Sequence, residues 1–242
     1  MVYGIFSDIH GNLEALEALT KALTDEKLDR LLCVGDIVGY GANPLECIDM
    51  ISDLKPAVVC GNHDAACCGL INTRCFNDRA RSAVIWTKKR IRTQDVELLQ
   101  GLKHVFKNGD ITMAHGTLHE PESFNYMINE TSARATFDLM DTKVCFVGHS
   151  HVPGIFSERP EEAPSYFYKK KFKLTKEERA IINVGSVGQP RDGDPRSCYC
   201  IYDSDARSVE FKRMTYDVQK AQKNIINAGL PSYLAFRLGK GV

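Results

Sequence analysis

The first sixty residues alternate short apolar runs with amphipathic segments. Runs at residues 2–6, 31–34 and 57–60 have the length and composition of buried strands. Leucines at helical spacing after the first run predict a helix that Asn12 would cap, and Pro44 stands at the first position of a second predicted helix. Because helices connect successive strands, this stretch predicts a parallel sheet with right-handed crossovers.

The rest of the chain changes from helices to strands. Helices are expected at 77–91 and 93–99, within a helical insert at about 66–102. Strands are expected near Val105 and at 111–114. Further strands, mostly antiparallel, are expected at 144–147, 155–157, 166–172, 180–184, 198–202 and 209–214, followed by a helix at 217–228. With 242 residues, 43% of them hydrophobic, and no linker or repeat, we expect a single α/β (α+β type) domain, residues 1–242, with two sheets.

Polar side chains follow the predicted strands at the points where the apolar runs stop. Five strand ends carry them: Asp8 with His10, Asp36, Asn62 with His63 and Asp64, His115, and His149 with His151. Residues two apart in an extended stretch point to the same side, so both rings of the last pair can face one point. The carboxyl ends of parallel strands meet at one edge, where binding sites assemble. A solvated turn would explain one such end, but five together predict a common metal site.

These residues, in this order and spacing, resemble the calcineurin-like metallophosphoesterases. The matching motifs are Asp8-x-His10, Gly35-Asp36, Gly61-Asn62-His63-Asp64, His115-Gly116 and Gly148-His149-x-His151. The resemblance extends to Phe76-Asn77, to Trp86-Thr87 and to the stretch NVGSVGQPRDGDPRSCY at 183–199. These additional features are similar to a branch of small microbial, phosphodiesterase-like members.

The resemblance implies a four-layer αββα sandwich, in which two mixed β-sheets pack face to face between helices, with two divalent metal ions at the strand ends. Carried over by position, Asp8, His10 and His151 would hold one ion, Asn62, His115 and His149 the other, and Asp36 would bridge both. Oxygen and imidazole ligands without sulfur suit manganese, iron, zinc, cobalt or nickel, and the ligand set does not choose among these metals.

The implied activity is hydrolysis of a phosphate ester, in which a hydroxide bridging the two ions attacks in line with the leaving group. Family analogy favours a phosphodiester or nucleotide-type substrate over a phosphomonoester, a phosphoprotein or a dinucleoside polyphosphate. A retromer subunit shares the fold and serves as a scaffold, so a non-catalytic scaffold or phosphate-binding protein is the alternative. The complete ligand set favours an enzyme. The insert and the loops at 116–125 and 186–195 are expected to shape its pocket.

Two residues next to the ligand Asn62 are candidate catalytic groups. The resemblance implies that His63 stabilises or protonates the leaving group, oriented by an acid. Asp64 is the nearest acid in sequence, and the loop at 37–40, another source of such an acid in the family, has no carboxylate here. The alternative for Asp64 is that it caps a helix.

Two residues elsewhere in the chain are candidate substrate-binding groups. Arg191 lies in a loop rich in glycine and proline, and its planar guanidinium group can bind a phosphate oxygen. The alternative for Arg191 is a surface ion pair with Asp192 or Asp194. Asn12 can approach the substrate, but helix capping explains this residue equally well.

Charge and cysteine content limit the partners and the compartment. The 31 basic and 31 acidic residues balance, so there is no global attraction to nucleic acid or to an anionic membrane. The stretch MVYGIFSDIHGN has no basic leader or long apolar run, and the nine cysteines include no CxxC pair, which together favour the cytoplasm. The expected partner is a small-molecule phosphate ester or nucleotide, and the sequence is compatible with a homo-oligomer.

Cys60, Cys67, Cys68 and Cys75 lie close together in the sequence. Thiolates at this density can hold a metal ion such as zinc. Free cysteines are more often small apolar residues inside a core, and this second interpretation is the preferred one.

Overall fold

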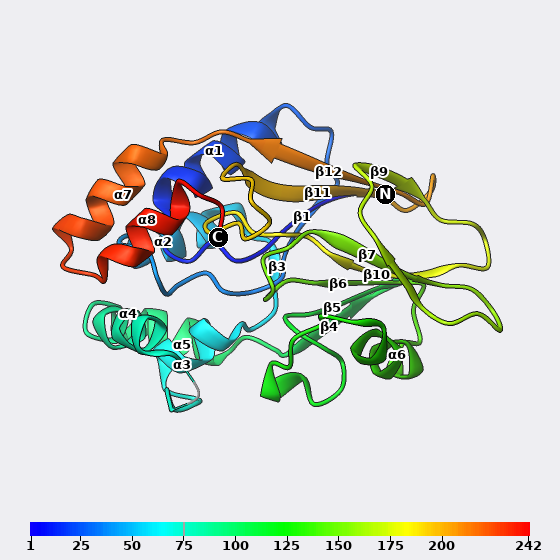
Figure 1. Ribbon diagram of the computed structural model, residues 1–242, viewed down its shortest axis with the longest axis horizontal. Coiled ribbons are helices and arrows are strands. Elements are labelled where there is room, and N and C mark those ends of the chain that lie inside the picture. Colours follow the sequence, from blue (N-terminus) through cyan, green and yellow to red (C-terminus); the bar gives the residue numbers. More distant parts are fainter. Residues whose placement is uncertain (75) are drawn as a thin grey trace.

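Two six-stranded sheets pack face to face in the computed structural model, which describes residues 1–74 and 76–242 (Figure 1). The first sheet has the order β3-β2-β1-β11-β12-β9 and contains β1 (Val2–Phe6), β2 (Arg30–Cys33), β3 (Ala57–Val58), β9 (Lys171–Lys173), β11 (Ser197–Asp203) and β12 (Ser208–Met214). The second has the order β4-β5-β6-β10-β7-β8 and contains β4 (Val105–Asn108), β5 (Ile111–Ala114), β6 (Val144–Val147), β7 (Gly154–Glu158), β8 (Ser165–Phe167) and β10 (Arg179–Asn183).

Helices cover the outer faces of both sheets. In Figure 1, α1 (Leu13–Thr24) lies above the first sheet and α6 (Glu130–Leu139) lies below the second. The helix α2 (Pro44–Leu54) also packs on the first sheet, and α7 (Val218–Asn227) and α8 (Ser232–Leu238) complete that side. The four-layer αββα sandwich with two mixed sheets is therefore confirmed. None of the helices that the structure describes is long and apolar enough to cross a membrane.

The strands are apolar on both faces because each sheet has an apolar layer on either side. Ile5 of β1 points into the layer between the sheets, where it joins Phe146 of β6. Its neighbour Phe6 points outward and packs with Leu16 of α1, and Phe137 of α6 packs on the outer face of the second sheet. Side chains thus alternate between two apolar layers instead of between core and water, which produces the continuous apolar runs in the sequence.

The parallel register of the strands positions the site. In the first sheet Phe6 lies opposite Cys33, and Cys33 opposite Val58, so β1, β2 and β3 end at the same edge. In the second sheet β5 and β6 are also parallel, with Met113 opposite Phe146. Residues that follow these five strands therefore emerge at one side of the sandwich.

The single strand predicted at 166–172 is wrong. The segment forms two short strands in different sheets, because β8 pairs with β7 and β9 pairs with β12. Phe167 and Phe172 both pack against the layer between the sheets, with ring centroids 5.0 Å apart. Residues five apart in one continuous strand would point to opposite faces, so the chain has to break between them.

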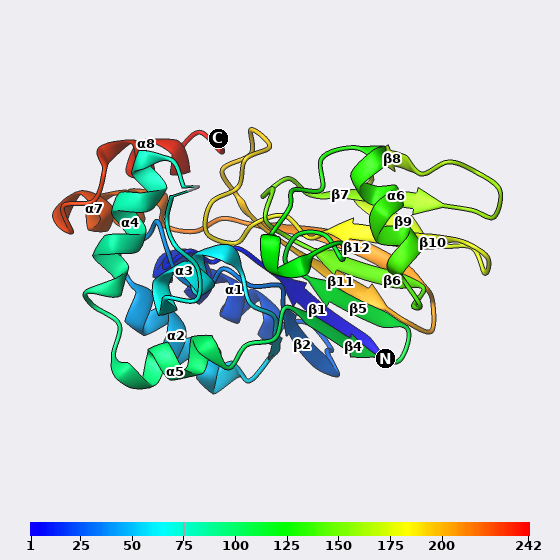
Figure 2. The ribbon, with the colours of Figure 1, turned by 90° about the horizontal axis from the view of Figure 1, so that it is seen from below.

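The insert contains three helices: α3 (Asn62–Cys68), α4 (Asp78–Lys88) and α5 (Thr93–Gln100). In Figures 1 and 2 these helices lie toward one end of the molecule and α6 toward the other. The helices α4, α5 and α7 were predicted within a few residues of their ends. The helices α3, α6 and α8 were not predicted, because α3 and α8 have seven residues each and α6 has few apolar residues at helical spacing.

Candidate metal centre

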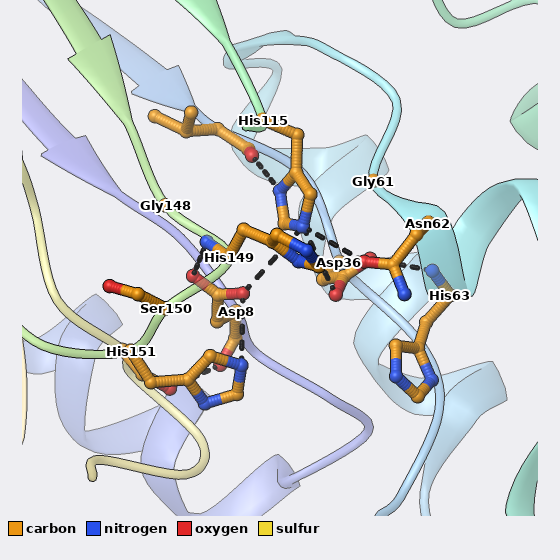
Figure 3. Close-up of polar contacts among 12 residues, drawn as sticks. Asp8, Asp36, Gly61, Asn62, His63, His115, Gly148, His149, Ser150 and His151 are labelled. Atoms are coloured by element: carbon orange, nitrogen blue, oxygen red, sulfur yellow. Dashed lines mark hydrogen bonds and ion pairs between the residues drawn. The ribbon is translucent and has the colours of Figure 1, made fainter. Parts of the chain in front are cut away.

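The predicted ligands come from the ends of strands in both sheets and meet in one place. In the first sheet β1 leads to Asp8, β2 to Asp36 and β3 to Asn62. In the second sheet β5 leads to His115 and β6 to His149. Figure 3 shows their side chains converging from separate strands toward a common centre.

Short distances between carboxylate oxygens and imidazole nitrogens define this centre. Asp8 Oδ1 lies 3.2 Å from His151 Nε2, and Asp36 Oδ2 lies 3.5 Å from His10 Nε2 and 3.3 Å from His115 Nε2. Three overlapping groups able to hold an ion result, namely Asp8 with His10 and His151, Asp36 with His115 and His149, and His10 with Asp36 and His63. The seventh predicted ligand joins the second group, since Asn62 Oδ1 lies 3.2 Å from His115 Nε2.

The backbone at the ligands has an unusual conformation. Five of them have positive φ angles: Asp8 at 55°, His10 at 52°, Asp36 at 54°, His149 at 65° and His151 at 62°. Non-glycine residues rarely adopt this left-handed region, and each costs on the order of 1 kcal/mol or more. Such a concentration at one place indicates that the turns after the strands are shaped to aim side chains inward.

Backbone carbonyl groups fix three of the imidazole rings. The Nδ1 atom of His10 lies 3.1 Å from the carbonyl oxygen of Val38, and that of His115 lies 2.7 Å from the carbonyl oxygen of Val34. His151 Nδ1 lies 2.6 Å from the carbonyl oxygen of Gln189. A carbonyl oxygen only accepts, so each Nδ1 carries a proton and each Nε2 points toward the centre, where the neutral form of the ring presents a lone pair to a metal ion.

The resulting cluster of lone pairs fits a bound cation. His10 Nε2 and His151 Nε2 lie 3.1 Å apart, and neither carries a proton in the tautomer that its carbonyl contact fixes. Asp8 Oδ1 is buried and has no hydrogen-bond partner among the residues described. Buried acceptors that face one another without a donor are destabilising. Metal ions between them would satisfy these atoms, so the donor set fits the divalent ions that the ligand types favour.

Electrostatics in the centre also favour a cation. Burial opposes the charged forms of Asp8 and Asp36, but His151 and His115 outweigh it and lower the pKa of both carboxyl groups. Burial lowers the pKa of His10 and of His151. In His115 the effect of burial is outweighed by Asp36, which raises the pKa to about 9. Two carboxyl groups with lowered pKa values in one buried site favour a bound cation.

Close packing around Asp36 requires glycine at position 61. An added Cβ atom at Gly61 would overlap the Asp36 Oδ1 atom. That oxygen accepts the backbone N–H of His63 at 2.8 Å, which ties the start of α3 to the end of β2. The glycines that adjoin the motifs thus allow close approach of the strand ends.

His63 lies beside the predicted ligands in a pocket of aromatic rings. Its ring centroid is 4.3 Å from that of Tyr40, 5.0 Å from that of Phe76 and 4.8 Å from that of His10. Burial lowers the pKa of His63 to about 4, and its Nδ1 atom has no hydrogen-bond partner among the residues described. Gly39 lies against this atom, because an added Cβ there would overlap Nδ1. Packing, and not an acid, therefore holds the ring.

The Asp64 carboxylate faces backbone amides. Its Oδ1 accepts the N–H groups of Ile37 at 2.9 Å and Val38 at 3.1 Å, and its Oδ2 accepts that of Gly61 at 3.1 Å. Burial raises the pKa of Asp64 to about 7. Among the residues described, the carboxylate forms no hydrogen bond with His63. This geometry favours the capping alternative, in which Asp64 joins the start of α3 to the loop that follows β2.

Arg191 points into the same pocket as the predicted ligands. The acids considered as its surface partners are engaged elsewhere, since Asp192 pairs with Arg213, and Asp194 pairs with Arg196 at 2.6 Å. The Arg191 Nε atom is buried without a hydrogen-bond partner in the described part of the chain. The surface-pair alternative is therefore wrong, and a donor remains available at the centre.

Asn12 uses both ends of its side-chain amide within the fold. Its Oδ1 accepts the N–H of Ala15 at 3.2 Å and so caps α1. Its Nδ2 donates to the carbonyl oxygen of Gly188 at 2.8 Å. The side chain is buried and does not line the pocket beside the metal centre, so this geometry favours the capping alternative.

A cavity of about 350 Å³ opens beside the metal centre. It is lined by residues of the insert, of the loop after β5, and by Arg191, as predicted for the loops that shape the pocket. Tyr126 was not predicted, although its ring stacks on that of His149 with centroids 3.8 Å apart. Its place in the loop after a ligand-bearing strand was the one sequence signal. Phe76, part of the family resemblance, also lines the cavity and contacts His63.

The cysteine cluster belongs to the core. Cys60, Cys67 and Cys68 are buried, and burial raises the pKa of each thiol. The groups able to hold a metal within residues 1–74 and 76–242 contain no cysteine. Cys75 lies outside the described residues. The interpretation as small apolar side chains therefore holds for these three residues.

The fold and the ligands define an α/β sandwich protein with a metal-binding centre of aspartate and histidine at its strand ends. The chain belongs to the calcineurin-like phosphoesterase superfamily, because the sequence model of that superfamily's domain matches residues 1–207. The family that the motifs predicted is thereby confirmed, and with it a hydrolase fold whose His and Asp groups can bind metal ions.

Three relatives span essentially the whole chain. An uncharacterized protein from Methanocaldococcus jannaschii is 37% identical over 241 residues, which are 98% of this chain and 97% of the relative. The crystal structure of a metallophosphoesterase from Sphaerobacter thermophilus has 40% identity and a TM-score of 0.86, and covers 100% of this chain and 99% of its own. A hypothetical protein from Pyrococcus horikoshii, with 17% identity and a TM-score of 0.82 over 100% and 98% of the two chains, shares the fold.

Proposed function

We propose that this protein is a metal-dependent phosphoesterase that hydrolyses a phosphodiester, with two divalent ions held by the seven predicted ligands. Asp8, His10 and His151 would hold one ion, Asn62, His115 and His149 the other, and Asp36 both. The observation that carries the proposal is the set of buried lone pairs, including Asp8 Oδ1 and two facing Nε2 atoms, that no donor in the described chain satisfies. When bound, such ions neutralise phosphoryl charge and lower the pKa of a water molecule.

The chain's own residues would orient the substrate and stabilise or protonate the leaving group. Arg191 would donate to a phosphoryl oxygen, since its guanidinium group lines the cavity beside His149 and His151. His63 would donate a hydrogen bond or a proton to the departing oxygen. Tyr40 and Phe76 hold the His63 ring by packing. Asp64 and Asn12 would act by holding loops in place.

Charge supports a diester over a monoester. Arg191 is the one lysine or arginine among the described residues that line the cavity, and the wall beyond the metal centre is largely neutral. A phosphodiester carries one negative charge and two substituents, which matches one arginine and a wall with no second cationic side chain among the described residues. A phosphomonoester dianion would call for more cationic donors.

The alternative is a non-catalytic scaffold or phosphate-binding protein of the same fold. A scaffold needs neither the inward-aimed lone pairs nor an arginine at the centre, so both features favour catalysis. We propose further that residues 1–242 act as one domain in the cytoplasm. The proposed compartment is supported by the eight described cysteines, which are all free and buried, as is usual in a reducing compartment.

A substrate panel with added metals tests the proposal. Purified protein with Mn, Fe, Zn, Co or Ni ions is assayed on bis(p-nitrophenyl) phosphate and p-nitrophenyl phosphate, with melting temperature measured in parallel. We expect hydrolysis that prefers the diester, and a melting temperature that rises with the active ion, because an ion that binds the folded state stabilises it. A melting-temperature rise without hydrolysis of either ester would support the phosphate-binding alternative.

A further inference from the structure

One wall of the cavity has no role in the metal centre. The cavity is lined by four aromatic side chains, namely Tyr40, Phe76, Phe124 and Tyr126. The rings of Tyr40 and Phe76 pack against the ring of His63. Phe124 is buried, whereas Tyr126 is 50% exposed. An exposed aromatic ring beside a polar centre is a common feature of ligand sites.

Tyr126 has one covered face and one open face. Its ring lies over the ring of His149 with an interplanar angle of 21° and a centroid distance of 3.8 Å. The stacking covers one face and fixes the orientation of the tyrosine. The residue as a whole is still 50% exposed, and it lines the cavity. A planar group bound in the cavity can therefore stack on the open face without displacing any protein group.

Polar groups line the same cavity as Tyr126. Asn72 and Asn77 line the cavity, and each uses its side-chain oxygen on a nearby backbone N–H, those of Arg74 at 2.9 Å and Ala80 at 3.0 Å. Their NH2 groups remain available as donors among the residues described. Glu122 adds a carboxylate acceptor to the same lining. The wall thus combines a stacking surface with both donors and an acceptor.

We infer that this wall is a nucleobase subsite, with Tyr126 as its stacking platform, so that the substrate is a nucleotide phosphodiester. The inference rests on the proposed function, because the phosphodiester must occupy the adjacent metal centre. A nucleobase has a planar ring for Tyr126 and an edge with both acceptors and N–H donors, which match the asparagine NH2 groups and Glu122. A lipid chain would leave these polar groups unpaired, and a second phosphate would meet the Glu122 carboxylate.

The test compares two esters with the same leaving group. Thymidine 5′-(p-nitrophenyl phosphate) and methyl p-nitrophenyl phosphate both release p-nitrophenolate but differ in the nucleoside. We expect Tyr126→Leu to raise the ratio of KM for the nucleoside ester to KM for the methyl ester about 10-fold, as expected when base stacking is lost. Tyr126→Phe keeps the ring and should behave like the wild type.

A matched control and a binding assay complete the test. Tyr168 is also 50% exposed but does not line the cavity, so Tyr168→Leu should change KM for neither ester. Thymidine binding to metal-free protein, followed by NMR titration, should weaken at least about 5-fold in Tyr126→Leu. Equal effects of Tyr126→Leu on both esters, or unchanged thymidine binding, would overturn the subsite. If neither ester is hydrolysed by the wild type but thymidine binding still depends on Tyr126, the proposed function fails and the subsite stands.

Discussion

The metal centre and the nucleobase wall lie side by side but are built differently. Six of the seven ligands are buried, three imidazole rings are fixed by backbone carbonyl groups, and five ligands occupy left-handed backbone. The wall uses exposed side chains from the insert and from the loop after β5, such as Asn72, Glu122 and Tyr126. The contrast teaches that the residues for chemistry are held by the sheets, whereas those for recognition are on connecting segments that can vary without disturbing the centre.

The largest effect in this comparison of the metal centre with the nucleobase wall is expected at Asp36, which belongs to the metal centre. Asp36→Asn preserves the shape of the side chain but removes a charge shared by both groups of ligands. We expect kcat/KM to fall by about 10³-fold or more, since several kcal/mol of metal-dependent stabilisation is lost. Metal content, measured by elemental analysis, should fall in parallel. Retention of both full activity and full metal content would show that Asp36 is not shared by the ions.

The second-largest effect is expected at His63, which packing holds between the metal centre and the nucleobase wall. We expect His63→Ala to lower kcat by about 10²-fold or more with little change in metal content, because general acid assistance is removed but the ligands remain. The loss should be smaller for p-nitrophenolate than for a methanol leaving group, which needs a proton more. Steady-state kinetics on the two leaving groups measures this difference, and equal losses would assign His63 a purely structural role.

A smaller effect is expected at Arg191, whose side chain lies between the centre and the wall. Arg191→Lys keeps the charge but loses the planar fork, so we expect KM to rise about 10-fold for both nucleoside and methyl esters. This pattern differs from that of Tyr126→Leu, which should raise KM for the nucleoside ester much more than KM for the methyl ester. A change in kcat with KM constant would instead place Arg191 with groups that act only in the transition state.

The sequence predicted the metal centre better than the nucleobase wall, for physical reasons. Strand ends are read from apolar runs that stop, and parallel strands bring their ends to one edge, so the sequence alone predicts that Asp8, Asp36 and His115 lie together. The fold class followed from the same runs. The break at 168–170 could not be predicted, because periodicity does not reveal that two sheets share one segment.

The wall lacks a comparable signal. Tyr126 lies in a loop, where no periodicity exists, and its contact with His149 joins segments that only the fold brings together. The lack of a carboxylate in the loop at 37–40 was visible in the sequence, but the role of Gly39 in packing against His63 required the overlap seen in three dimensions. Likewise, the two possible roles of Asp64 and of Asn12 could be separated only by hydrogen bonds to backbone groups distant in sequence.

The smallest expected effect compares two helix caps, one in each region. Asn12 caps α1 beneath the centre, and Asn77 caps α4 beside the wall with the same side-chain oxygen geometry. Loss of a cap costs about 1 kcal/mol of unfolding free energy, and Asn12→Ala also loses the bond to Gly188, so we expect about 1–2 kcal/mol for Asn12→Ala and about 1 kcal/mol for Asn77→Ala. Denaturant unfolding measures both values.

Kinetics on the same two variants then separates stability from recognition. Asn12 does not line the cavity, so KM for the nucleoside ester should stay within about twofold in Asn12→Ala. Asn77 does line it, so Asn77→Ala should raise that KM about 3-fold or more through the loss of one donor, while KM for the methyl ester stays constant. A raised KM for both esters in Asn12→Ala without a loss of stability would restore Asn12 as a substrate-binding residue. The boundary between the two regions would then extend to the start of α1, because the residue that caps this helix would also contact the substrate.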